Sequence, residues 1–386
     1  MYAAAVAIVR LGELLGQDAV ASFLTSVVRQ GRPSTAYLFQ GPPGVGKGTA
    51  ALAFARALLC ERAETRGDAC GECAACHKTA TRQHPDLKFL FPVSGEERAL
   101  ETTIAEVLQG MREEPLFVFI YEKAASIRLS MTRELLRELS FAPYESMRRV
   151  VVVRDADRMR EDQYSALLKA LEEPGASTVW VLTTARPPRL PATIRSRCQK
   201  VRLAPLSEAQ LRGFLEKRAD VPPKEARLLA ALSGGSLARA LNLRHSGAGE
   251  VRDEAMALLQ PAMRGDATRL WKAAQAFMQY GKTGRESLKR MFEIHQLWLR
   301  DVLRVQAELP PDTLAHREQE AELKRVAATL TPREIRRRLS ILEEAMQSID
   351  GNVTADLTIF SSLARAAGSR MGDGRWPSHF TARWDY

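Results

Sequence analysis

The fold is decided by residues 36–49, which read AYLFQGPPGVGKGT. The apolar run Ala36 to Phe39 is typical of a buried strand, and the stretch Ala50 to Leu59 after the glycines is typical of a helix. A strand, a glycine-rich loop and a helix in this order form a cradle for phosphate groups. The sequence therefore predicts a phosphate-binding loop after the first strand of a sheet.

The loop supplies the groups that such a cradle needs, with one departure. Its glycines let backbone N–H groups converge on an anion, the helix N-terminus adds its dipole, and the lysine adds a point charge. A Ser or Thr is expected directly after the lysine, where its hydroxyl coordinates magnesium, but this place is taken by a glycine and the Thr comes one residue later. The candidate nucleotide-binding residues are Gly41, Gly44, Gly46, Lys47, Gly48 and Thr49.

A second departure concerns the acidic partner of the loop. That partner is expected at the end of another strand, and Val150 to Val153 leads directly into Arg154 and Asp155. If residues 156–159 set the register, Arg154 replaces the magnesium-linked Asp and Asp155 replaces the water-activating Glu, which makes this acidic site degenerate. Because phosphoryl transfer depends on charge neutralised by magnesium, we do not expect this chain to hydrolyse ATP. Binding of ATP stays open, and an active enzyme in which Thr49 takes over the magnesium contact is the alternative.

Four of the five cysteines fall within seventeen residues. The spacing C-x9-C-x2-C-x2-C provides four thiolates, which fill the coordination sphere of one tetrahedral zinc ion and leave no open position for catalysis. We therefore predict a structural zinc module at residues 60–76, and Cys198 stands apart from it. The predicted metal ligands are Cys60, Cys70, Cys73 and Cys76.

The distribution of strand and helix patterns predicts the organisation of the chain. Residues 10–206 alternate apolar runs with helical stretches, which is typical of an α/β domain in which helices cover both faces of a parallel sheet. After Pro205 only helix-period patterns remain, and Thr331, Pro332 and Glu334 predict the start of one of these helices. Residues 371–386 carry no period and read as a flexible tail.

Charge and hydropathy limit the class of protein. No apolar run approaches the roughly 20 residues of a membrane-spanning helix, so we expect a cytoplasmic protein without membrane contact. Lys and Arg exceed Asp and Glu by 56 to 46, a net charge of +10. This charge favours an acidic partner such as nucleic acid, whereas a composition rich in Arg on solvated helix faces explains it equally well.

Three further segments carry a resemblance to a known family. They are ALLKALEEP at residues 166–174, LTT at residues 182–184 and SRC at residues 196–198. In this order they resemble the clamp-loader branch of the AAA+ ATPases, and the similarity extends over roughly residues 10–245. The resemblance implies an AAA+ domain at 10–206, a small helical lid at 207–245 and an all-α collar domain for oligomerisation at 246–370.

The resemblance also implies roles for single residues. The arginine of the SRC segment, Arg197, would act as an arginine finger on the nucleotide of a neighbouring subunit. Thr183 or Thr184 matches the position that senses nucleotide. The second sensing arginine would be Arg239, one place later than expected, with Ala238 in the usual place.

Within this family the departures at Gly48 and Arg154 resemble a structural member that does not hydrolyse ATP. Such a member implies a hetero-oligomer with delta and gamma/tau subunits, which loads the beta sliding clamp on primed DNA within the DNA polymerase III holoenzyme. That holoenzyme is classed as a nucleotidyltransferase, although no polymerase carboxylate constellation is visible here. An ATP-hydrolysing motor subunit of the gamma/tau kind is the alternative.

Overall fold

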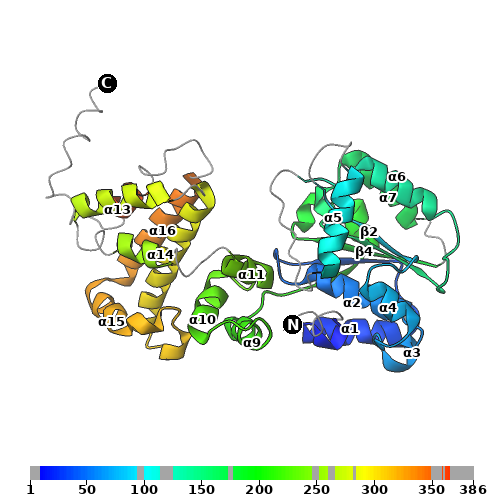
Figure 1. The fold of residues 1–386 in the computed structure, drawn as a ribbon, viewed down its shortest axis with the longest axis horizontal. Coiled ribbons are helices and arrows are strands. Elements are labelled where there is room, and N and C mark those ends of the chain that lie inside the picture. Colours follow the sequence, from blue (N-terminus) through cyan, green and yellow to red (C-terminus); the bar gives the residue numbers. More distant parts are fainter. Residues whose placement is uncertain are drawn as a thin grey trace, which may run out of the picture. The chain divides into compact units, whose positions relative to one another are not determined.

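The computed structural model describes residues 9–93, 100–113, 125–172, 177–245, 252–259, 266–280, 284–348, 359 and 361–365. The chain divides into two compact units (Figure 1). The first consists of Met1–Gln210 with Gly235–Arg239, and the second of Leu211–Gly234 with Ala240–Tyr386. The predicted tail at 371–386 lies outside the described residues. The separation of residues 207–245 and 246–370 into a lid and a collar stays a prediction.

The first unit is built on a parallel sheet of five strands. These are β1 (Ala36–Gln40), β2 (Leu87–Leu90), β3 (Arg149–Val153), β4 (Thr178–Thr184) and β5 (Gln199–Arg202). Their order is β2-β3-β4-β1-β5, and every pair is parallel. The central strands β1 and β3 are buried at each residue, as expected for a parallel sheet covered on both sides. The predicted parallel sheet is confirmed.

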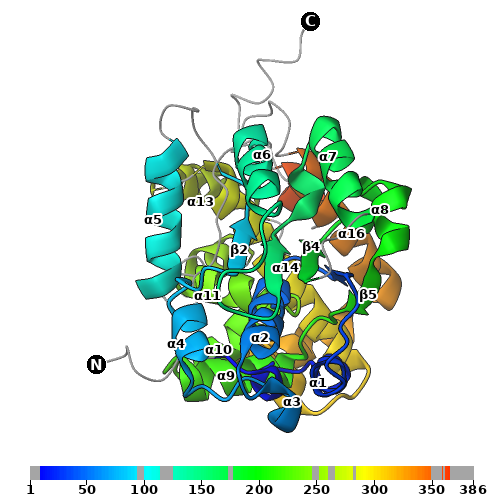
Figure 2. The ribbon, with the colours of Figure 1, turned by 90° about the vertical axis from the view of Figure 1, so that its right-hand side faces the viewer.

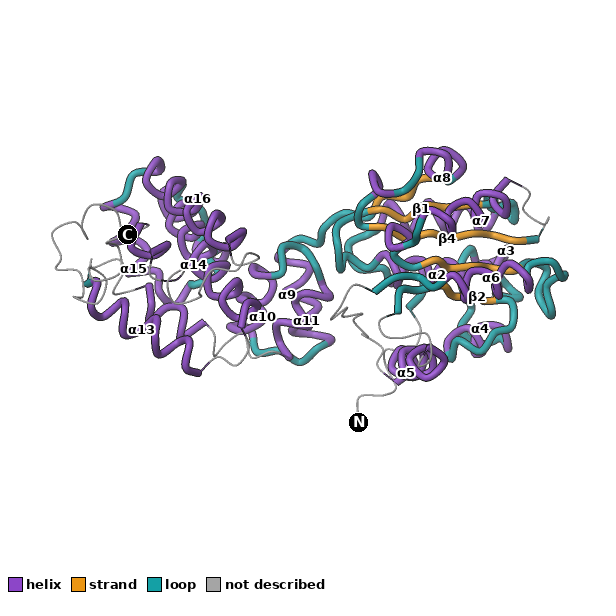
Figure 3. Tube along the Cα trace, turned by 90° about the horizontal axis from the view of Figure 1, so that it is seen from above, coloured by secondary structure: helices purple, strands orange, loops and turns teal. Residues whose placement is uncertain are grey.

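Helices cover both faces of this sheet (Figure 1), and its strands, in orange, run side by side in Figure 3. The helices of the first unit are α1 (Asp18–Arg29), α2 (Lys47–Leu59), α3 (Ala63–Arg66), α4 (Ala74–Ala80), α5 (Leu100–Glu113), α6 (Leu129–Glu138), α7 (Glu161–Glu172) and α8 (Ala192–Arg197). Successive strand side chains point to opposite faces. Tyr37 and Phe39 accordingly belong to a core with α1 and α2, and Leu38 to a core with α6, α7 and α8. Figure 2 shows α1 to α4, in blue, gathered in one part of this unit.

One loop of the first unit is held by a buried carboxylate. Asp86 is 0% exposed, and it accepts backbone N–H groups of Tyr144 at 2.6 Å, Glu145 at 2.9 Å and Ser146 at 2.9 Å. These residues belong to the 140–148 loop, which connects α6 with β3. The loop is therefore tied to the buried Asp86 through its backbone, and yet it presents three large apolar side chains to solvent, Phe141, Tyr144 and Met147. No sequence pattern pointed to this loop.

Asp86→Asn is expected to lower the free energy of unfolding by about 2–3 kcal/mol, because the amide offers one acceptor oxygen and turns an NH₂ group toward N–H donors. Burial by itself raises the pKa of Asp86, but the three N–H donors outweigh it and the pKa lies below its usual value. Such a group stabilises the fold above its unfolded pKa of about 3.9 and loses that contribution as the pH falls through the folded pKa. The difference in free energy of unfolding between wild type and variant should therefore be largest at neutral pH and become smaller in acid.

Urea unfolding of both proteins at neutral pH and at about pH 3 measures this difference. Glu145→Gln is the control on the same loop. The Glu145 carboxylate pairs with Lys78 and lies 3.3 Å from Nε2 of the buried His84, but it is itself partly exposed, and its loss is expected to cost about 1 kcal/mol or less. Equal urea midpoints of wild type and Asp86→Asn at neutral pH would show that the carboxylate does not hold the loop.

In the second unit, the elements assigned to the described residues are helices. They are α9 (Glu208–Arg218) from Leu211 onward, α10 (Pro223–Leu232), α11 (Leu237–His245) from Ala240 onward, α13 (Ala267–Tyr280), α14 (Gly284–Gln306), α15 (Glu320–Thr329) and α16 (Pro332–Ser348), with short 3₁₀ turns between α14 and α15. The predicted start of α16 is confirmed, since Thr331 N–H donates to Glu334 Oε2 at 2.8 Å and Glu334 N–H donates to Thr331 Oγ1 at 3.2 Å. Within the described part of the chain, no helix has both the length and the apolarity needed to cross a bilayer.

Candidate functional site

The phosphate-binding loop lies between β1 and α2, at the carboxyl end of its strand. Gly44 and Gly46 adopt the left-handed conformation, with φ of 72° and 95°, which favours glycine at both places. Lys47 is buried, and its Nζ donates to the carbonyl oxygens of Gly41 at 2.9 Å and Pro42 at 2.6 Å. The ammonium group is therefore folded back into its own loop.

The charge of Lys47 depends on its surroundings. Burial lowers the pKa of Lys47 to about 8, an effect that Asp155 and Asp157 partly oppose and Arg154 reinforces. At neutral pH the side chain remains mostly protonated. Two cations and two carboxylates thus share the space at the carboxyl ends of β1 and β3.

The two departures from the phosphate-loop pattern meet in space. A Cβ atom on residue 48 would lie 2.8 Å from Nη1 of Arg154, so the guanidinium occupies the place that a Ser or Thr side chain would take. Arg154 directly follows β3, and its Nε lies 3.6 Å from Oδ2 of Asp155. Gly48 and Arg154 therefore form one local arrangement.

Two threonines at the end of β4 connect this arrangement to the sheet. Asp155 has φ of 47°, and its N–H donates to Oγ1 of Thr183 at 3.0 Å. Thr184 Oγ1 donates to Oδ1 of Asp157 at 2.7 Å and accepts the N–H of Arg186 at 2.9 Å. The predicted sensor-like threonines thus lie beside the degenerate acidic segment, where they fix its backbone and one of its carboxylates.

A segment distant in sequence closes on the loop at Gly44. A Cβ atom added to Gly44 would lie 2.0 Å from Oγ of Ser236 and 3.0 Å from Cβ of Ala238. The N–H of Ala238 donates to the carbonyl of Gly44 at 3.3 Å. Ser236 and Ala238 are therefore the residues of this segment that contact the loop at Gly44, whereas the side chain of Arg239 is exposed. Sequence reasoning did not foresee the contact of Ser236.

Arg197 lies at the opposite end of the sheet from the phosphate-binding loop. It closes α8 just before β5, and β5 begins with Gln199 beside Tyr37, near the start of β1. The loop follows the other end of β1, at Gln40, and strands rise about 3.3 Å per residue. The structure does not bring Arg197 to the candidate nucleotide-binding residues of its own chain.

The guanidinium of Arg197 has partners within its own unit. Its Nη2 lies 2.5 Å from Oε1 of Glu172 at the end of α7, and its Nη1 donates to the carbonyl of Thr193 at 3.0 Å. Both side chains of the ion pair are partly exposed, with 38% for Arg197 and 49% for Glu172. An exposed pair of this kind is weak, so the arginine can exchange it for a more negative partner.

The four cysteines meet at the end of α2. Their Sγ atoms lie within 4.8 Å of one another, with 3.9 Å between Cys70 and Cys76 and 4.0 Å between Cys60 and Cys73. Zinc–sulfur bonds of about 2.3 Å in a tetrahedron place sulfur atoms about 3.8 Å apart. The donor set and its spacing therefore fit one zinc ion held by four buried thiolates.

Backbone groups around the cluster favour thiolates. N–H groups of Glu72 and Cys73 donate to Sγ of Cys70 at 3.4 and 3.3 Å. Burial by itself raises the pKa of Cys70, but these donors and the neighbouring thiols outweigh it and bring the pKa to about 6. Burial raises the pKa of Cys60 and Cys76. A bound cation would keep those two sulfurs deprotonated.

The cysteine module also fastens the start of the described chain. Asp68 accepts the N–H groups of Leu11 at 3.1 Å and Gly12 at 3.2 Å, and Arg10 donates to the carbonyl of Cys70 at 3.0 Å. Arg56 is buried next to the module and donates to Oγ1 of Thr79 at 3.3 Å. The module is therefore an integral part of the first unit.

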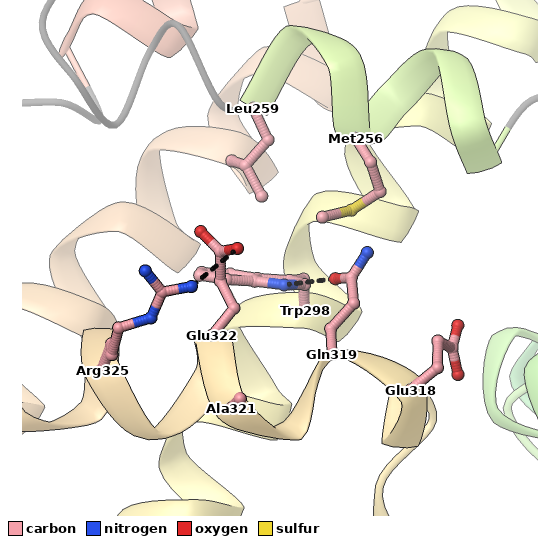
Figure 4. A pocket seen from close by; sticks show the side chains of 8 residues that line it. All are labelled: Met256, Leu259, Trp298, Glu318, Gln319, Ala321, Glu322 and Arg325. Carbon is pink, nitrogen blue, oxygen red and sulfur yellow. Dashed lines mark hydrogen bonds and ion pairs between the residues drawn. The ribbon is translucent and has the colours of Figure 1, made fainter.

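A pocket of about 260 Å³ in the second unit offers no comparable chemistry (Figure 4). At its centre the indole N–H of Trp298 donates to Oε1 of Gln319 at 3.1 Å. Its carboxylates, Glu318 and Glu322, form ion pairs with Arg252 and Arg325. The pocket-lining residues are Met256, Leu259, Trp298, Glu318, Gln319, Ala321, Glu322 and Arg325. The pocket is thus lined by apolar and charge-paired groups.

A parallel sheet with a glycine-rich loop between its first strand and a helix defines the class of P-loop nucleotide-binding proteins. The family described as "DNA polymerase III, delta subunit" matches residues 16–207, nearly the whole first unit. This match and the delta' relatives of the chain support a delta-prime type clamp-loader subunit of DNA polymerase III.

Curated relatives cover part of the chain. A DNA polymerase III delta' subunit of Pseudomonas aeruginosa is 34% identical over 218 residues, which are 56% of this chain and 58% of that protein. The delta' subunit of Bacillus subtilis is 32% identical over 227 residues, 59% of each chain. The tau subunit of Salmonella typhimurium is 31% identical over 258 residues, 64% of this chain and 35% of that protein. The matches thus span little more than half of the delta' relatives.

Proposed function

We propose that this chain is a structural clamp-loader subunit, which does not hydrolyse ATP itself and supplies Arg197 to the nucleotide of a neighbouring motor subunit. The contact between Arg154 and Gly48 carries the proposal. Both positions that direct magnesium in an active phosphate loop are altered here, and the cation at 154 fills the space left by the glycine at 48. Without that ion the charge on a transferred phosphoryl group is not neutralised, and hydrolysis loses its main source of catalysis.

The position of Arg197 supports action on another subunit. This arginine lies at the end of the sheet opposite the phosphate-binding loop of its own chain, on an exposed helix end. A guanidinium brought in trans stabilises the charge that develops on the transferred phosphoryl group. Arg197 is therefore the residue that we propose as the arginine finger.

The remaining assignments complete this proposal. The four cysteines hold a structural zinc ion, Gly41 to Thr49 form the nucleotide-binding loop, and the helices of residues 246–370 form the collar that joins the ring. The partners are delta and gamma/tau subunits and, through them, the beta clamp and primed DNA. Because tau relatives match at similar identity, the altered phosphate loop is what favours the structural subunit over a motor.

The isolated chain is expected to hydrolyse no ATP above background. The measurement is steady-state phosphate release by the chain alone and after mixing with gamma/tau, delta, clamp and primed DNA. Lys47→Ala is the matched control, since any activity that persists in this variant comes from a contaminant. Release by the isolated wild-type chain at a rate comparable to that of the motor subunit, abolished in Lys47→Ala, would replace the structural proposal by the motor alternative.

A further inference from the structure

The guanidinium of Arg154 lies beside residue 48, the position from which an active phosphate loop coordinates its metal ion. A coordinating hydroxyl on residue 48 would be one bond from Cβ, and magnesium lies about 2.1 Å from such an oxygen. Nη1 of Arg154 lies 2.8 Å from that Cβ position, so the guanidinium approaches residue 48 about as closely as the ion would. Arg154 therefore places a positive charge in this part of the loop without any bound metal.

The charged groups around the guanidinium favour an anion over a divalent cation at this place. Asp155 neighbours Arg154 at 3.6 Å, and Asp157 accepts the hydroxyl proton of Thr184 at 2.7 Å. Lys47 is the second cation, buried at the start of α2. A divalent cation added here would meet two positive side chains and no hydroxyl on residue 48, whereas an anion would meet both cations and the N–H groups of the loop.

We propose that the loop binds the polyphosphate group of a nucleoside di- or triphosphate without a divalent metal ion, and that Arg154 supplies the charge that the metal supplies elsewhere. This role of Arg154 also requires glycine at position 48, because a side chain there would collide with the guanidinium. The geometry uses existing groups only, since Lys47 exchanges its two carbonyl partners for phosphate oxygens. Bound nucleotide then stays intact, since binding without the metal leaves the phosphoryl group unactivated.

The test is ADP binding by the full-length chain, measured by calorimetry with no added Mg²⁺ and with saturating Mg²⁺. Chelators are left out so that the cysteine site keeps its metal, and residual magnesium is measured by emission spectrometry. We expect dissociation constants within about twofold of each other, and a loss of at least about tenfold for Arg154→Ala, the effect of one charge-assisted hydrogen bond. Arg160→Ala is the matched control, because it removes an exposed arginine six residues along the chain and should leave binding unchanged.

A second variant tests the pairing. Gly48→Ser combined with Arg154→Asp returns the hydroxyl and the carboxylate, and ADP binding by this double variant is expected to weaken at least about tenfold when Mg²⁺ is omitted. The inference fails if the wild type needs Mg²⁺ or binds no ADP in either buffer. This inference rests on the proposed function, because both take residues 41–49 as a nucleotide-binding loop. Failure of the inference and failure of the proposed function remain distinguishable, because ADP binding tests the first and ATP hydrolysis in the assembled complex tests the role of Arg197.

Discussion

The wild-type chain is expected to bind one zinc ion through its four clustered cysteines, and Cys73→Ser is expected to lose it. Cys73 is the N-cap residue of α4, and its Sγ lies 4.0 Å from Sγ of Cys60. Removing this sulfur leaves three ligands in a site that four would close. Because structural zinc contributes its binding free energy to folding, the melting temperature should fall by about 10 °C, which corresponds to several kcal/mol in a domain of this size. Metal analysis and thermal unfolding measure the two effects.

Cys198→Ser provides the matched control for this substitution. Cys198 is buried in the core formed with α6, α7 and α8, away from the four clustered sulfurs, and burial raises its pKa to about 11. The same chemical change at Cys198 should leave the zinc content at one per chain. Equal metal content in Cys73→Ser and wild type would show that the cluster does not bind zinc.

Loss of zinc should also loosen the segment that precedes α1. Asp68 and Cys70 hold this segment through hydrogen bonds to Leu11, Gly12 and Arg10. Hydrogen exchange at residues 9–14 is therefore expected to become faster in Cys73→Ser and to stay unchanged in Cys198→Ser. The segment reports on the metal site without being part of it.

Arg197→Ala is expected to slow hydrolysis at the neighbouring subunit's site by about 10³-fold or more, the usual contribution of an arginine finger. The substituted chain should still assemble, because Arg197 is partly exposed and its ion pair with Glu172 is weak. The measurement is single-turnover ATP hydrolysis by a complex in which only the motor subunit beside this chain is active. Nucleotide affinity should change far less than the rate, since the charge that the finger stabilises develops in the transition state.

Arg195→Ala separates this effect from a general loss of charge. Arg195 precedes Arg197 by two residues on α8, so the two side chains leave the helix on nearly opposite sides. Assembly and rate should match the wild type in this control. If Arg197→Ala assembles and hydrolyses ATP as fast as Arg195→Ala, the arginine acts on no neighbouring nucleotide.

Local patterns in the sequence were sufficient for the parallel sheet, the glycine-rich loop between its first strand and a helix, the four-cysteine set and the start of α16. Each depends on residues close in the chain: an apolar run before glycines, cysteines separated by two residues as in Cys70, Cys73 and Cys76, or a threonine three residues before a glutamate. Hydrogen bonding and metal coordination impose these spacings directly, and a single sequence therefore displays them.

Other features required the tertiary structure. These features involve residues far apart in the chain. They are the approach of Arg154 to Gly48, the contact of Ser236 with Gly44, and the separation of Arg197 from the glycine-rich loop of its own chain. The sequence by itself determined which groups are present, a glycine at 48 and an arginine at 154. Only the order and register of the strands decided that these two groups meet, because pairing between strands depends on packing across the whole sheet rather than on neighbours in sequence.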